Sequence, residues 1–165
     1  MDARPRRAEP ASAAALGEPK AGLGRDDLGF LLAKATQRWN ELLAERFAAG
    51  GYGDVRPSYG SVLLPLFEED GLRMGELAQR ARLSKQTMTE MVRRLERDRL
   101  VERRADPSDG RASLIFLTAR SRGFAPIAAG VLCELDRLVR QRLGEERVDE
   151  LRAALQELLS LGDDS

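Results

Sequence analysis

The chain has 165 residues, of which 42% are hydrophobic and 33% charged, and its basic and acidic side chains balance to a net charge of zero. This length fits one globular domain, and no apolar run is long enough to cross a bilayer or to form a signal peptide, so a soluble cytoplasmic protein without membrane association is expected. The chain has no histidine and one cysteine, Cys133, which excludes an intrachain disulfide; neither a metal nor a cofactor is expected.

The first residues differ in composition from the rest of the chain. Residues 1–25 are rich in Ala, Pro, Gly and Arg without an apolar period, which predicts a disordered tail. Its Arg4, Arg6 and Arg7 either touch phosphate or are solvated, and a solvated tail is favoured. From Leu28 onward apolar residues recur at helical spacing, and a helix over residues 28–47 is predicted, ended by a cluster of glycines.

A second helix is predicted from about residue 58 to residue 68. Pro65 lies inside it, so a kink or an early end is expected there. Asp70-Gly71 indicates a turn, and residues 72–73 are expected to add a short strand to a hairpin further along the chain.

Residues 74–95 have the spacing of two short helices joined by a tight turn at Arg82-Leu83, a helix-turn-helix. Ser84 is a natural N-cap for the second helix. One face of that helix is predicted to be core, formed by Met88, Met91, Val92 and Leu95.

The opposite face of the second helix suits the major groove of DNA. Gln can pair with adenine, Thr can contact a thymine methyl or a phosphate, and Arg can reach guanine or the backbone. The alternative is a solvated polar face, which every amphipathic helix has. This face holds Gln86, Glu90, Arg93 and Arg97, flanked by Thr87, Thr89 and Arg94.

Residues 100–118 predict a strand, a tight polar turn and a second strand, closed by a Thr suited to capping a following helix. The turn carries Asp106, Pro107, Ser108, Asp109 and Gly110. A helix-turn-helix followed by such a hairpin is a winged helix, and double-stranded DNA is the expected partner.

Arg111 stands at the far edge of the turn, where it is expected to enter a narrow, electronegative minor groove. Asp109 either orients its guanidinium or braces the turn. Arg103 and Arg104 are expected to be phosphate contacts or strand-edge charges. Residues 73–122 hold thirteen basic and seven acidic residues, a basic module on an acidic remainder.

After Thr118, apolar spacing predicts a long helix that reaches about residue 139 and bends at Pro126, a break at Gly144, and a final amphipathic helix over residues 148–159. The central module cannot cover the apolar stripes of the terminal helices. A second copy of the chain is therefore the expected partner; packing within one monomer is the alternative.

The central sequence resembles the MarR family of bacterial winged helix-turn-helix regulators. The motifs that carry the resemblance are Leu77-Ala78, Leu83-Ser84, Thr87-x-Thr89, Leu95-Glu96, Leu100-Val101-x-Arg103, Asp106-Pro107-x-Asp109-x-Arg111 and Leu117-Thr118. The resemblance implies an obligate homodimer, a recognition helix over residues 84–98, a wing arginine at Arg111, and a crevice for a small ligand between the dimer helices and the winged helix.

Three positions depart from the family pattern. Arg99 stands where relatives usually have Gly, so the left-handed C-cap of the recognition helix is expected to be strained or absent. Glu90 replaces a residue that is often basic; it either accepts a hydrogen bond from cytosine or pairs with Arg94, and pairing is favoured. Ser121 replaces a common Gly.

The expected fold is mainly α with a small β-hairpin wing. Residues 26–162 form the winged-helix domain, with dimerisation helices at 26–56 and 119–162 and a DNA-binding lobe at 57–118. The expected DNA contacts, on the recognition helix and on a wing at residues 103–113, are Ser84, Lys85, Gln86, Thr87, Thr89, Arg93, Arg94, Arg103, Asp109 and Arg111.

The expected function is a ligand-responsive homodimeric repressor on a pseudo-palindromic operator, located in the bacterial cytoplasm and at the nucleoid when bound. Arg38, Trp39 and Tyr59 are candidate contacts for a small aromatic or other organic effector, with a dimer-core role as the alternative for Trp39. An enzyme is not expected, because the chain lacks histidine, a phosphate loop and a nucleophile–base pair.

Two alternatives remain open: a winged helix used for protein–protein contact, and a redox sensor at Cys133. The thiol is predicted to lie opposite the apolar stripe of its helix, one turn before Arg137 and two before Arg140, and nearby cations favour the thiolate.

Overall fold

The structure is a computed structural model, and it describes residues 24–161. The tail predicted for residues 1–25, with Arg4, Arg6 and Arg7, lies outside the described residues except for its last two positions. The chain divides into two compact units after Thr36. The first unit contributes the start of α1 (Leu28–Ala49), and the second, from Gln37 onward, holds the rest of α1 and every other helix and strand of the described part.

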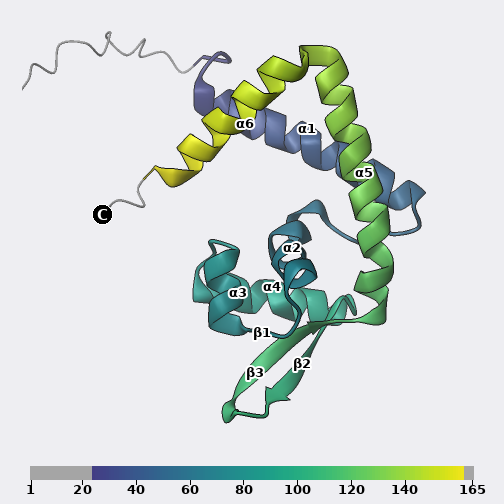
Figure 1. The fold of residues 1–165 in the computed structure, drawn as a ribbon, viewed down its shortest axis with the longest axis vertical. Coiled ribbons are helices and arrows are strands. Elements are labelled where there is room, and N and C mark those ends of the chain that lie inside the picture. Colours follow the sequence, from purple (N-terminus) through teal and green to yellow (C-terminus); the bar gives the residue numbers. More distant parts are fainter. Residues whose placement is uncertain (1–23, 162–165) are drawn as a thin grey trace, which may run out of the picture. The chain divides into compact units, whose positions relative to one another are not determined.

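The second unit contains a winged helix followed by two long helices (Figure 1). Every element expected from the sequence is present, and the fold class, mainly helical with a small hairpin sheet, is confirmed. Among residues 24–161, no helix is both long and apolar enough to cross a membrane. The elements after α1 are η1 (Pro57–Tyr59), α2 (Gly60–Glu68), β1 (Leu72–Arg73), α3 (Met74–Arg80), α4 (Lys85–Arg97), β2 (Val101–Asp106), β3 (Asp109–Leu117), α5 (Ala119–Leu143) and α6 (Glu145–Ser160).

The two prolines expected to disturb helices do not end them. The helix α2 continues past Pro65 to Glu68, and the N–H of Glu69 still donates to the carbonyl of Pro65. The helix α5 includes Pro126 and runs on to Leu143. A proline removes one hydrogen bond, and the buried apolar side chains on either side of each one keep its helix packed against the core.

The sheet has the strand order β1-β3-β2, with both pairs antiparallel. Figure 1 shows β2 and β3 projecting as a long arm beyond α3 and α4. The turn is shorter than expected: only Pro107 and Ser108 form the tip, whereas Asp109 and Gly110 already belong to β3. The reason is local, because the carboxylate of Asp106 accepts from both the backbone N–H and the hydroxyl of Ser108 and closes the turn there.

The core of the winged helix forms where the helix-turn-helix packs on the sheet. Met88, Val92 and Leu95 of α4 are fully buried, as predicted, together with Leu77 of α3 and Ile115 of β3. Burying a side chain of this size stabilises the fold by roughly 1.5–3 kcal/mol. The core therefore fixes which face of α4 points outward.

Both helices of the helix-turn-helix end on an arginine in the left-handed region. Arg82 has φ 50° and Arg99 has φ 57°. At each of them, the N–H of the arginine and the N–H of the next residue complete the same capping motif. Arg99 donates to the carbonyl of Glu96 and Leu100 to that of Leu95, and the turn at Arg82 repeats this pattern. The left-handed C-cap at Arg99 is thus present without glycine.

Replacing Arg99 by glycine should raise the free energy of unfolding by about 0.5–1 kcal/mol. Left-handed backbone costs an L-residue roughly 1–2 kcal/mol, and part of the gain is offset by the greater freedom of glycine in the unfolded chain. Thermal or urea unfolding measures the change. The matched control is Arg93→Gly in the interior of α4, which should lower stability by about 1 kcal/mol; a loss of stability in Arg99→Gly would contradict the argument.

Candidate nucleic-acid interface

The start of α4 uses several of its hydroxyl groups internally. The Ser84 hydroxyl accepts from the N–H of Thr87 at 3.1 Å, which confirms the predicted N-cap, and it lies 2.8 Å from the Thr87 hydroxyl. The Thr89 hydroxyl donates to the carbonyl of Lys85 at 2.8 Å. Of the predicted DNA contacts on α4 and its N-cap, Ser84, Thr87 and Thr89 therefore already have structural partners.

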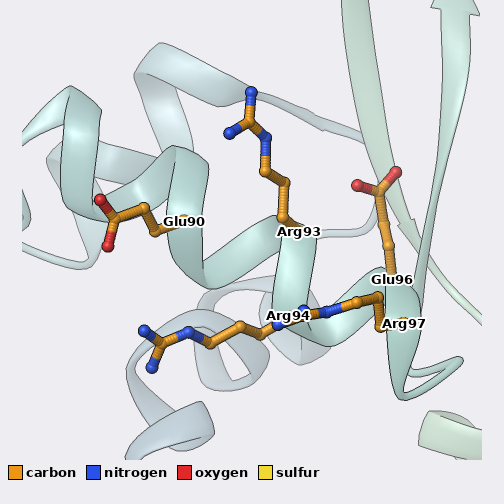
Figure 2. Close-up of a pocket in the computed structure, with 5 residues that line it drawn as sticks. All are labelled: Glu90, Arg93, Arg94, Glu96 and Arg97. Carbon is orange, nitrogen blue, oxygen red and sulfur yellow. The ribbon is translucent and has the colours of Figure 1, made fainter.

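The basic side chains of α4 and Gln86 have no such partners. Lys85, Gln86, Arg93, Arg94 and Arg97 are exposed, and none makes a hydrogen bond or ion pair with another residue in the range 24–161. The three arginines line a shallow depression of 490 Å³ together with Glu90 and Glu96. Figure 2 shows Arg93 and Arg94 pointing away from the helix in different directions. Their charges are available to a polyanion.

Glu90 and Glu96, the two acidic residues of this depression, behave differently. The carboxylate of Glu96 accepts from Nε of Arg103 at 3.0 Å and so ties β2 to α4. The predicted pair of Glu90 with Arg94 is wrong, because neither residue makes an ion pair within the described chain. An exposed pair of this kind contributes only about 0.3–0.5 kcal/mol, too little to hold two long side chains together.

Arg103 and Arg104 are less available than the arginines of α4. Arg103 is engaged by Glu96, as described above. The guanidinium of Arg104 donates to Glu102 and lies over the ring of Phe116, 4.4 Å from its centre. Arg103 and Arg104 were expected to be either phosphate contacts or strand-edge charges. Their contacts fit strand-edge charges better, because both guanidinium groups already pair with carboxylates of the protein.

Arg111 follows the tip of the wing with an exposed side chain. Asp109 accepts from its backbone N–H at 3.0 Å, so the carboxylate braces the backbone and does not orient the guanidinium. The guanidinium itself bonds no described residue. Gly110 has no left-handed φ and open space around it, so neither its backbone nor its surroundings require a glycine there.

The tip of the wing is anchored to β1 by a contact that the sequence did not reveal. Asp106, only 5% exposed, accepts from Nε of Arg73 at 2.8 Å in addition to its bonds from Ser108. The hydroxyl and N–H of Ser108, and then Arg73, lower the pKa of Asp106 to about 2. Because the pKa of this carboxyl is lower in the folded chain than in the unfolded chain, where it is near 4, its ionisation stabilises the fold at pH values above about 4. This contribution declines as the pH falls from about 4 to about 2.

A cavity of 260 Å³ lies between α1 and the winged helix, within the second unit. Of the three predicted effector contacts, only Trp39 lines it. Arg38 instead pairs with Glu41 at 3.1 Å on the surface of α1. The polar lining comes from Asn40, Arg56 and Ser61, and the apolar lining from Trp39, Leu43, Phe47, Val55, Pro57, Gly60, Leu63, Leu64, Phe67, Phe124, Ala128 and Leu132.

Tyr59 connects the neighbourhood of this cavity to the recognition helix. It is 2% exposed, and its hydroxyl donates to the carboxylate of Asp98, the C-cap of α4, at 2.5 Å. Burial, and then this hydrogen bond, raise the pKa of Tyr59. Arg120 of α5 donates to the carbonyl of Asp98 at 2.6 Å, so the end of α4 is held from two sides.

Cys133 is exposed on α5, on the side expected from the helical spacing. One of the two cations invoked to activate it is committed elsewhere, because the guanidinium of Arg140 pairs with Asp136, Glu145 and Asp149. This weakens the case for a redox role. Ser121 is fully buried and donates to the carbonyl of Thr118, so it fits the place of glycine with its hydroxyl satisfied.

A helix-turn-helix whose outer face carries unpaired cations, with a basic hairpin beside it, has the architecture of a winged-helix DNA-binding domain. The sequence profile of the MarR family matches residues 57–113. The HTH-type transcriptional regulator TtmR of Methylorubrum extorquens is 38% identical over 103 residues, which are 62% of this chain and 50% of that protein. An HTH-type transcriptional repressor of Mycobacterium bovis is 36% identical over 93 residues, 56% of this chain and 67% of that one.

Among solved structures, the transcriptional repressor CouR bound to a 23-mer DNA duplex superimposes with a TM-score of 0.69 at 26% identity, over 84% of this chain and 99% of that chain. The match thus spans half the length of TtmR but nearly all of CouR. The chain belongs to the MarR family, whose members are transcriptional regulators and not enzymes.

Proposed function

We propose that the protein is a homodimeric repressor that binds a pseudo-palindromic operator through α4 and the wing and is released by a small organic effector. The observation that carries the proposal is the set of exposed side chains without partners: Lys85, Gln86, Arg93 and Arg94 on α4 and Arg111 on the wing. Side chains that make no bonds in the protein are free to bond bases and phosphates.

Repression and DNA contact are supported by relatives. The mycobacterial relative is described as a repressor, and CouR is a repressor seen on a DNA duplex. A two-fold dimer places two recognition helices about one turn of DNA apart, so two half-sites with this spacing are expected. A footprint on the protein's own promoter, at two salt concentrations, tests this directly; protection without a symmetric centre would reject the dimeric mode.

The cavity supports an effector of defined chemistry. Its wall is aromatic and aliphatic, and Arg56 supplies one cation, so a small aromatic carboxylate fits it. Trp39 would contact the ring. Aromatic carboxylates added to the footprint should release the protected DNA, and Arg56→Ala should abolish release without weakening binding to the operator.

Gln86 and Arg93 are expected to read bases. Replacing either by Ala should cost roughly 1–3 kcal/mol at the cognate operator and relax the preference at one position per half-site. Anisotropy titrations against single-base variants of the operator measure this. The control is Arg142→Ala at the end of α5, which removes an exposed charge outside the winged helix. Equal loss on cognate and scrambled DNA would reassign the residue to phosphate contact.

A further inference from the structure

Glu90 is an acidic side chain in the middle of a surface that otherwise attracts DNA. It is the sixth residue of α4, and at about 100° per residue it lies within about 20° of the line opposite the buried stripe of Met88, Val92 and Leu95. Its side chain is exposed and makes no ion pair or hydrogen bond with any residue from 24 to 161. Gln86 precedes it by one turn.

A carboxylate in this position repels phosphates, so its presence needs a compensating partner in the groove. An ionised carboxylate only accepts hydrogen bonds. In the major groove, the donors are the N4 amino group of cytosine and the N6 amino group of adenine, and adenine sets the acceptor N7 beside its donor. Cytosine has no acceptor next to its amino group on that edge, so it is the better partner.

We propose that Glu90 selects a cytosine in each half-site of the operator by accepting a hydrogen bond from its N4 amino group. The assignment rests on the proposed DNA-reading function of α4. The absence of an ion pair between Glu90 and Arg93 or Arg94 among residues 24–161 supports it, because such a pair would consume both groups. Figure 2 shows the Arg93 side chain pointing away from Glu90. Because Glu90 and the arginines are not paired with each other, an arginine within one turn can donate hydrogen bonds to guanine while Glu90 accepts one from cytosine.

The test is a scan of all four bases at each operator position, by anisotropy, with the full-length wild type, Glu90→Ala and Glu90→Gln. The wild type should prefer cytosine at one position per half-site by roughly tenfold or more. Glu90→Ala should lose that preference and keep the others, while its affinity for unrelated DNA rises. Glu90→Gln should move the preference at the same position toward adenine, which an amide can contact twice.

Glu68→Gln provides the matched control, because it removes the same charge from an exposed position of the DNA-binding lobe outside α4. It should leave every base preference unchanged. If Glu90→Ala binds all sequences more tightly by the same factor, the carboxylate only repels phosphate and the assignment is wrong. If the wild type itself shows no base preference, the proposed function fails at an earlier step.

Discussion

Alanine at position 111 is expected to weaken operator binding by about 2–4 kcal/mol for the dimer, or roughly 30- to 1000-fold, with no change in the thermal midpoint. The guanidinium of Arg111 bonds no described residue and is exposed on β3, just beyond the wing tip, so its removal leaves the fold intact. In the proposed dimer, two copies of Arg111 would act. The loss should shrink when A·T pairs that flank the half-sites become G·C, because the groove widens and its negative potential falls.

The controls for this prediction come from the same hairpin. Asp109→Ala removes the acceptor of the Arg111 N–H, so it loosens the backbone without removing the cation and should give a smaller defect. Arg104→Ala removes a wing arginine that already pairs with Glu102 and stacks on Phe116, and it should have the smallest effect. Titrations over a range of salt concentrations measure all three. Wild-type affinity in Arg111→Ala at every salt concentration would rule out a role of the wing cation.

The sequence predicted the helices and strands because their signals are local. Met88, Val92 and Leu95 recur on one face of α4 at helical spacing, and Ser84 caps it with its own side chain, so both features are visible within a short segment. The strand at Leu72–Arg73 was also predicted, since it precedes the helix-turn-helix directly.

The contacts between segments were not predictable in this way. Arg73 and Asp106 are 33 residues apart, and only the register of β1 on β3 brings them together. The hydrogen bond of Tyr59 to Asp98 spans 39 residues, and it takes Tyr59 away from the effector role that its aromatic ring suggested. For Glu90 and Arg94 the spacing allowed a pair, but solvent competes well enough that the two side chains separate.

The substitution Leu155→Glu is expected to convert the proposed dimer into a monomer. On α6, the only buried residue in the single chain is Val148, whereas Leu151, Leu155, Leu158 and Leu159 remain between 36% and 66% exposed. Covering each leucine would contribute roughly 1.5–3 kcal/mol, which makes this stripe the natural interface for a second copy. A buried charge at its centre, present twice by symmetry, should cost about 6 kcal/mol, or four orders of magnitude in the dissociation constant.

Sedimentation velocity at micromolar concentration measures the change, and operator binding measured in parallel should fall because a monomer occupies only one half-site. The matched control is Ala153→Glu, which adds the same charge to the same helix about 160° away from Leu155, on its polar side. It should remain dimeric and bind DNA normally. If Leu155→Glu remains dimeric, the leucine stripe of α6 is not the dimer interface. If the wild type itself sediments as a monomer, the dimer is wrong and the two half-sites are bound independently.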